Sequence, residues 1–156
     1  MRRFDKVLFV GTDNTARSPM AEAICKNMVL DETLEITSRG LVVLFPEPIN
    51  PKTEVVLINH GITTMEGRQA RQLEQQDMNE QTLVLTMTTE QRDKILRDYQ
   101  MVTSIYTLSD YAEEMAEGDV MDPYGGTLVE YEECFNELSR MIKKLVIKLR
   151  KTYGLQ

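Results

Sequence analysis

The residues of this chain whose types and spacing best suit a binding or catalytic site lie at positions 10–19, which read VGTDNTARSP. An apolar run at 6–10 is typical of a buried strand, and Pro19 suits the first position of a helix. A strand that runs into a short loop and a helix points backbone N–H groups and the helix dipole at one spot. Arg17 adds a fork that can hold two phosphate oxygens. The pattern predicts an anion site; the competing interpretation is a plain strand–helix turn with a surface arginine.

Two stretches together resemble the low-molecular-weight protein tyrosine phosphatase family. The first, VLFVGTDNTARSPMAEAI, is similar to the family signature, in which a cysteine, five residues and an arginine-serine pair follow the first strand. The second, DPYGG at 122–126, is similar to the family's general-acid segment. Arg17 and Asp122 are 105 positions apart in the family's order, and the resemblance extends over essentially the whole chain.

The resemblance implies a role for each residue of the loop. Arg17 would bind phosphate and stabilise the transition state, Asn14 would hold the shape of the loop, and Ser18 would hydrogen-bond the nucleophile. The phosphate-binding residues would be Gly11, Thr12, Asp13, Asn14, Thr15, Ala16, Arg17 and Ser18.

Residues outside the loop complete the site that the resemblance implies. Asp122 would protonate the leaving phenolate. Tyr124 would help to line the mouth of the pocket, and Arg39 with the loop after it would form part of the rim.

Three positions depart from the family pattern. The nucleophile position is Gly11, the frequent second cysteine is replaced by Ala16, and the usual glycine before the asparagine is Asp13. Tyrosine phosphatase chemistry needs a thiolate that attacks phosphorus. Loss of such a nucleophile costs on the order of 10⁶ in kcat, or roughly 8 kcal/mol. The expectation is a pseudophosphatase, which binds phosphate or a phosphorylated ligand with little or no hydrolysis.

No other residue is well placed to attack. Cys25 and Cys134 fall on apolar helix faces and are expected in the core. Asp13 follows a strand, as in acyl-phosphate phosphatases, but lacks their paired aspartates. A water working with Arg17 and Asp122 could support slow hydrolysis. Two alternatives to the pseudophosphatase therefore stay open: a phosphatase with an altered or residual mechanism, and an interaction protein with a vestigial pocket.

Composition limits the class of protein and its partners. The net charge of −7 and the pI near 4.8 argue against nucleic acid or an anionic membrane as a partner. Two cysteines without a CxxC pair and a single histidine predict no metal site, and no cofactor is expected. The apolar run at the N-terminus is too short for a signal peptide or a membrane span, so a cytoplasmic protein is expected. The resemblance is to the bacterial type of the phosphatase family. The oligomeric state is left open.

Strand and helix patterns alternate along the chain. Strands are expected at 6–10, 34–37, 83–87 and 104–108. Helices are expected from Ser18, at 52–60, at 89–99 and at 129–151, with a short surface helix within 67–78. This order implies right-handed crossovers and a four-stranded parallel sheet with helices on both faces. The chain is therefore predicted to be one three-layer α/β domain over residues 1–156.

Overall fold

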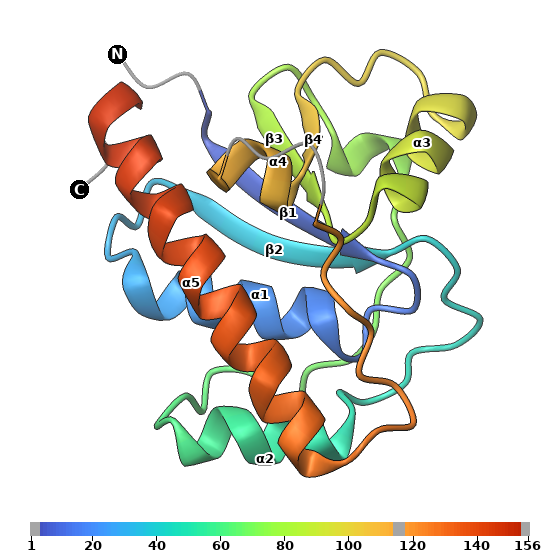
Figure 1. Ribbon diagram of the computed structural model, residues 1–156. Coiled ribbons are helices and arrows are strands. Elements are labelled where there is room, and N and C mark those ends of the chain that lie inside the picture. The colour runs from blue at the N-terminus through green and yellow to red at the C-terminus, as the bar shows by residue number, and fades with distance from the viewer. Residues whose placement is uncertain (1–3, 114–117, 154–156) are drawn as a thin grey trace.

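A four-stranded parallel sheet forms the centre of the computed structural model, which describes residues 4–113 and 118–153 (Figure 1). The strand order is β2-β1-β3-β4. The strands are β1 (Lys6–Gly11), β2 (Glu35–Gly40), β3 (Thr82–Thr86) and β4 (Ile105–Thr107). The predicted single α/β domain with a four-stranded parallel sheet is confirmed.

Helices cover both faces of this sheet, as expected for parallel strands. One face carries the long helix α5, with α1 and α4 packed against it, and α2 also contacts α5. The other face carries α3 (Figure 1). The helices are α1 (Arg17–Met28), α2 (Pro51–Asn59), α3 (Thr89–Asp98), α4 (Leu108–Glu113) and α5 (Leu128–Tyr153).

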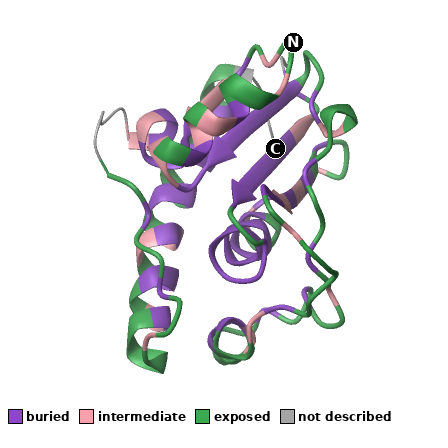
Figure 2. Cartoon of the chain, turned by 90° about the vertical axis from the view of Figure 1, so that its right-hand side faces the viewer, coloured by how far each residue is buried: buried purple, intermediate pink, exposed green. Residues whose placement is uncertain are grey.

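The central strand β1 divides the core into two parts. Val7 and Phe9 point into the larger part, which α1 and α5 close, while Leu8 and Val10 point into a smaller part under α3. All four side chains are fully buried, and Figure 2 shows the burial continuing along the strand. Because successive side chains of a strand alternate between faces, an uninterrupted apolar run is needed when both faces are covered.

The prediction of a short surface helix within 67–78 is wrong. Only a single 3-10 turn, Gln75–Asp77, forms there, and the preceding residues lie extended beside the end of β2. The amide of Gly40 donates to Arg71 O at 2.8 Å, and the amide of Leu73 donates to Gly40 O at 2.8 Å. These bonds to a distant strand satisfy backbone N–H and C=O groups that a helix would have satisfied with bonds inside the segment.

The short helix α4 was not predicted, because its six residues follow β4 without a turn signal. The other predicted strands and helices exist, and their ends differ from the predicted ones by at most three residues.

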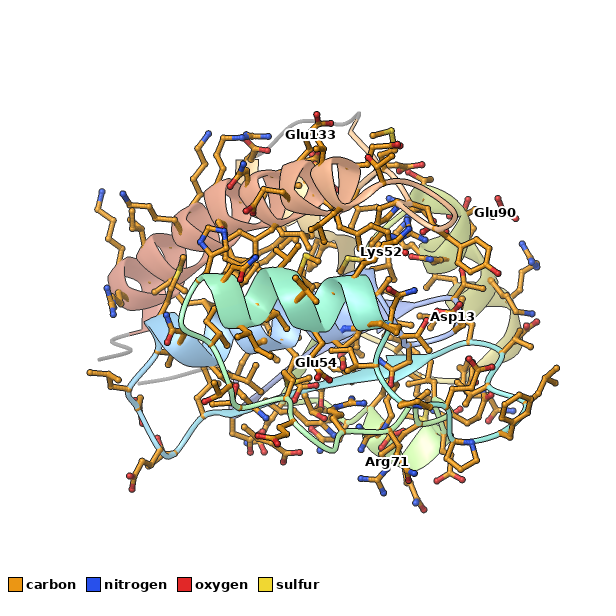
Figure 3. The ribbon with its side chains drawn as sticks, turned by 90° about the horizontal axis from the view of Figure 1, so that it is seen from below. Asp13, Lys52, Glu54, Arg71, Glu90 and Glu133 are labelled. Atoms are coloured by element: carbon orange, nitrogen blue, oxygen red, sulfur yellow. The ribbon has the colours of Figure 1, made fainter. Side chains whose placement is uncertain are left out.

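The carboxyl ends of the parallel strands indicate where the candidate site lies. The strand β1 pairs with β2 on one side and with β3 on the other, and the chain runs from β1 to β2 and then back across β1 to β3, so the direction of winding reverses beside β1. In open α/β sheets, ligands bind outside the carboxyl ends of the strands at such a reversal. Figure 3 shows Asp13, just after β1, at the same end of the molecule as Lys52 at the start of α2.

Candidate active site

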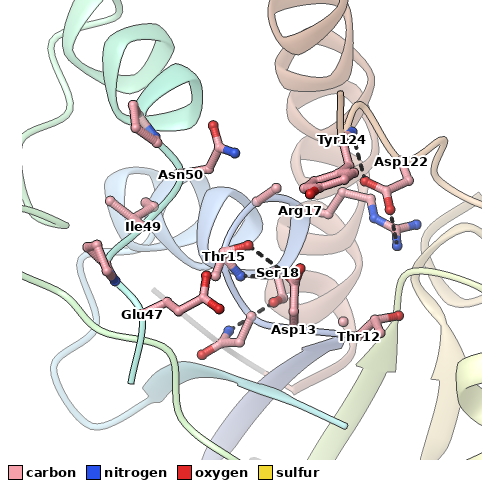
Figure 4. Close-up of a pocket in the computed structure, with 15 residues that line it drawn as sticks. Thr12, Asp13, Thr15, Arg17, Ser18, Glu47, Ile49, Asn50, Asp122 and Tyr124 are labelled. Atoms are coloured by element: carbon pink, nitrogen blue, oxygen red, sulfur yellow. Dashed lines mark hydrogen bonds and ion pairs between the residues drawn. The ribbon is translucent and has the colours of Figure 1, made fainter. Parts of the chain in front are cut away.

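A cavity of about 420 Å³ opens at the carboxyl end of β1 (Figure 4). Three segments far apart in the sequence form its wall: the loop after β1, the loop before α2, and the segment before α5. The lining residues are Gly11, Thr12, Asp13, Asn14, Thr15, Ala16, Arg17, Ser18, Glu47, Pro48, Ile49, Asn50, Pro51, Asp122 and Tyr124. All eight predicted phosphate-loop residues therefore line one cavity.

The first residues of α1 lie in the wall of this cavity. The first turn of any α-helix has N–H groups without an intrahelical acceptor. The N-cap of α1 is Ala16, whose side chain makes no capping hydrogen bond. The helix dipole adds partial positive charge at the same end. The strand, loop and helix thus have the arrangement on which the prediction of an anion site depends.

Asn14 bends the loop and ties it to its surroundings. Its backbone has φ of 61°, a left-handed conformation that asparagine tolerates better than most residues. Its Nδ2 donates to Ser18 Oγ at 2.9 Å and to Ser38 Oγ at 3.0 Å. Its Oδ1 accepts from the amide of Arg71 at 3.0 Å. These bonds join the loop to β2 and to the segment beyond α2.

A buried ionic network lies beneath Asn14, and the sequence reasoning missed it. Arg68 donates to Asn14 Oδ1 at 3.2 Å, to Ser38 Oγ at 2.7 Å and to Glu22 Oε1 at 3.1 Å. Glu22 is 3% exposed and also pairs with Lys26 at 2.7 Å. Burial lowers the pKa of Arg68, although the Glu22 carboxylate partly opposes the shift. No spacing in the sequence signals this pairing of residues 46 positions apart.

Arg17 joins the loop to the segment before α5. Its Nη1 donates to the carbonyl oxygen of Val120 at 2.7 Å, and its Nη2 lies 3.6 Å from Asp122 Oδ2. The Arg17 side chain is only 8% exposed, whereas that of Asp122 is 52% exposed. A buried guanidinium held by two partners lies in the cavity wall with little freedom to turn away.

A carboxylate of the loop itself folds back onto the loop backbone. Asp13 Oδ1 accepts from the Thr15 amide at 3.1 Å and from Thr15 Oγ1 at 2.9 Å. One backbone N–H of the predicted anion cradle is therefore already bound to an anionic side chain of the chain itself.

Comparison with known proteins agrees with this geometry. The profile of the "Low molecular weight phosphotyrosine protein phosphatase" family matches residues 6–154. The chain belongs to this family. Its relatives include the low molecular weight protein-tyrosine-phosphatase PtpB of Staphylococcus haemolyticus, 37% identical over 140 residues, which are 90% of this chain and 96% of that protein. PtpB of Staphylococcus aureus is 32% identical over the same shares.

Solved structures of relatives have the same fold. The YwlE arginine phosphatase from Geobacillus stearothermophilus has a TM-score of 0.87 and 31% identity, covering 94% of this chain and 93% of that one. A low molecular weight protein tyrosine phosphatase from T. tengcongensis has a TM-score of 0.83 and 35% identity, covering 92% and 98%. The predicted family and its sheet architecture are confirmed.

Gly11 stands at the position that the resemblance assigns to the nucleophile. Gly11 lies in the cavity wall, and a Cβ built there would lie 3.0 Å from Ser18 Oγ. A side chain at this position would therefore point at the hydroxyl expected to hydrogen-bond the nucleophile. The Ser18 hydroxyl would need to shift by a few tenths of an ångström, which a serine side chain can do by rotating.

The two cysteines of the chain do not reach the cavity. Cys25 and Cys134 are buried in the core, 0% and 6% exposed, as predicted. Burial raises the pKa of each thiol to about 12. A thiol of this kind is protonated at neutral pH and is a poor nucleophile.

The two residues predicted at the rim differ in position. Tyr124 lines the cavity and is exposed, as expected. Arg39 is not among the lining residues. Its side chain lies 3.4 Å from Asp77 Oδ2 and donates to Thr37 Oγ1 at 2.9 Å. The expectation for Arg39 is corrected, because a carboxylate on the 3-10 turn holds its guanidinium.

The described residues offer neither a metal site nor a membrane-spanning helix. No group of three histidine, cysteine or acidic side chains in residues 4–113 and 118–153 could hold a metal ion. In the same part of the chain, no helix has the length and apolar character that a membrane crossing requires.

Proposed function

We propose that this family member is a pseudophosphatase, which binds phosphate or a phosphorylated ligand in the 11–17 loop and hydrolyses it little or not at all. The observation that carries the proposal is Gly11, which has no side chain at the position that the resemblance assigns to the nucleophile. Arg17 and Asp122, the positions for transition-state binding and general acid, still face the cavity. Deleting a nucleophile removes covalent catalysis but leaves binding and electrostatic stabilisation.

The names of the relatives suggest which ligands to test. PtpB is named a protein-tyrosine-phosphatase and YwlE an arginine phosphatase. Phosphotyrosine and phosphoarginine are therefore the two probes, with inorganic phosphate and vanadate as minimal ligands. The buried, unpaired thiols agree with a reducing compartment, and we place the protein in the cytoplasm.

The test compares the natural chain with Gly11→Cys and Gly11→Ala. Both variants add a Cβ next to Ser18, but only cysteine adds a thiol, so alanine is the matched control. We expect the natural chain and Gly11→Ala to bind phosphate without turnover of an aryl phosphate. Gly11→Cys should hydrolyse the aryl phosphate measurably and form a phosphocysteine that can be trapped by acid quench.

Two other functions are outcomes of the same test. Turnover by the natural chain within tenfold of Gly11→Cys would replace the proposal with a phosphatase of altered mechanism, in which water attacks beside Arg17 and Asp122. Failure to bind phosphate, vanadate, phosphotyrosine or phosphoarginine at millimolar concentration would replace it with an interaction protein whose pocket is vestigial. A Gly11→Cys variant that binds phosphate but stays inactive would show that Asp13 or Ala16 has reshaped the loop.

A further inference from the structure

The cavity around the phosphate loop is unexpectedly acidic for an anion site. Three carboxylates line it, those of Asp13, Glu47 and Asp122, against the single guanidinium of Arg17. The phosphate group itself is assigned to the loop and Arg17, not to these acids. The acids therefore act on the rest of the ligand and influence which phosphorylated ligand the site accepts.

Only one of the three carboxylates forms an ion pair with a cationic side chain of the cavity wall. Asp122 pairs with Arg17 at 3.6 Å. Asp13 accepts only from the neutral amide and hydroxyl of Thr15. Within the described residues, neither Asp13 nor Glu47 forms an ion pair, and both are exposed at the cavity mouth (Figure 4).

Two cations of neighbouring segments have partners of their own. Lys52 Nζ donates to the carbonyl oxygen of Gly126 and lies 5.8 Å from the centroid of the Tyr131 ring. Arg68 lies beneath the loop and is bound to Glu22 and Ser38. Neither residue lines the cavity, so the two exposed carboxylates present net negative charge to an incoming ligand.

The backbone fixes the place of Glu47. Prolines flank it at positions 46 and 48, which restricts the local dihedral angles. Its carbonyl oxygen accepts from the Ala70 amide at 2.7 Å, and Pro48 forms a bridge with Gln69. The carboxylate is therefore presented by a tethered segment, opposite the loop that carries Asp13 (Figure 4).

We propose that Asp13 and Glu47 are specificity-determining residues that select phosphorylated peptides with arginine or lysine next to the phosphorylated residue. This inference rests on the proposed function. A phosphoryl group bound by the loop is repelled by two nearby carboxylates, and cationic side chains on the same ligand reverse the sign of that interaction. Charges about 5–8 Å apart at a protein surface interact strongly enough to change affinity severalfold.

The test measures the binding of two fluorescent phosphotyrosyl peptides of equal length, one flanked by arginines and one by glutamates. At low salt the natural chain should bind the basic peptide at least roughly tenfold more tightly, and 0.5 M salt should shrink the preference because it screens exposed charges. Asp13→Asn, which keeps an oxygen that can accept from Thr15, and Glu47→Gln should each reduce the preference roughly threefold to tenfold.

Glu133→Gln is the matched control, because it removes one negative charge from the exposed outer side of α5, away from Asp13 (Figure 3). It should leave the preference unchanged, and all three variants should keep the thermal midpoint of the natural chain. Equal loss of preference in Glu133→Gln would mean that net charge alone acts, and would overturn the inference.

The remaining outcomes separate this inference from the proposed function. If phosphate binds but the two peptides bind equally, the specificity inference fails and the pseudophosphatase stands. If the unphosphorylated basic peptide binds as tightly as the phosphorylated one, the acids form a cation site and the inference fails. If neither phosphate nor any phosphopeptide binds, the proposed function itself fails.

Discussion

Nη2 of Arg17 lies 3.6 Å from Oδ2 of Asp122, and this ion pair joins the two ends of the site across 105 positions of the chain. The same guanidinium donates to Val120 O, so it fixes the segment that carries Asp122 as well as the carboxylate itself. The amide of Tyr124 in turn donates to Asp122 Oδ1 at 3.0 Å. The Asp122 carboxylate is therefore held at the cavity mouth by Arg17 and by the Tyr124 amide.

This arrangement predicts that Asp122 still works as an acid once a thiol is supplied. In the Gly11→Cys background, Asp122→Asn should lower kcat for phosphotyrosine about 10²- to 10⁴-fold, since the leaving phenolate loses its proton donor. Stopped-flow and steady-state assays measure the change, and phosphate affinity should stay equal or rise. Asp93→Asn on the exposed side of α3 is the control. An undiminished rate in the Asp122 variant would remove the residue from the acid role.

Asn14 is predicted to be the residue of the loop on which stability depends most. Asn14→Ala puts alanine, which tolerates the left-handed region less well than asparagine, at φ of 61° and removes the side-chain bonds to Ser18, Ser38 and the Arg71 amide. The strain and the lost bonds together should lower the free energy of unfolding by about 2–4 kcal/mol, read from urea denaturation. Phosphate binding should weaken at the same time.

Asn14→Gly separates the two contributions to this loss. Glycine adopts φ of 61° without strain but makes none of the side-chain bonds, so this variant should be about 1 kcal/mol more stable than Asn14→Ala. Equal stability of the two variants would show that backbone strain contributes nothing at this position.

The two thiols are predicted to be inert in the folded protein. Because burial raises the pKa of Cys25 and Cys134 to about 12, the thiolate fraction at pH 7.5 is below about 10⁻³. Iodoacetamide should label neither residue in native buffer within an hour and both in 6 M guanidinium, as mass spectrometry would show. Gly11→Cys should add one thiol that reacts without denaturant, and phosphate should protect it. Rapid native labelling of Cys134 would reopen its candidacy as a nucleophile.

Sequence reasoning was sufficient where local chemistry decides the structure. The apolar run of β1, the proline near the start of α1 and the arginine-serine pair predicted a strand, a loop and a helix that carry an anion site. The sequence alone also shows that position 11 has no side chain and that Asp13 adds a negative charge. These features concern neighbouring residues, whose periodicity and side-chain types follow directly from order along the backbone.

The tertiary structure decided which distant residues meet at the site. Arg68 reaches Asn14 across 54 positions, and Glu47 enters the cavity wall from a proline-rich loop. Arg39, expected at the rim, turns instead to Asp77. Such pairings depend on how sheet register and crossover loops bring segments together, and neither leaves a period or motif in the sequence. Order along the chain therefore determined the loop and the absence of a side chain at Gly11, whereas packing determined the network beneath the loop and the acidic mouth above it.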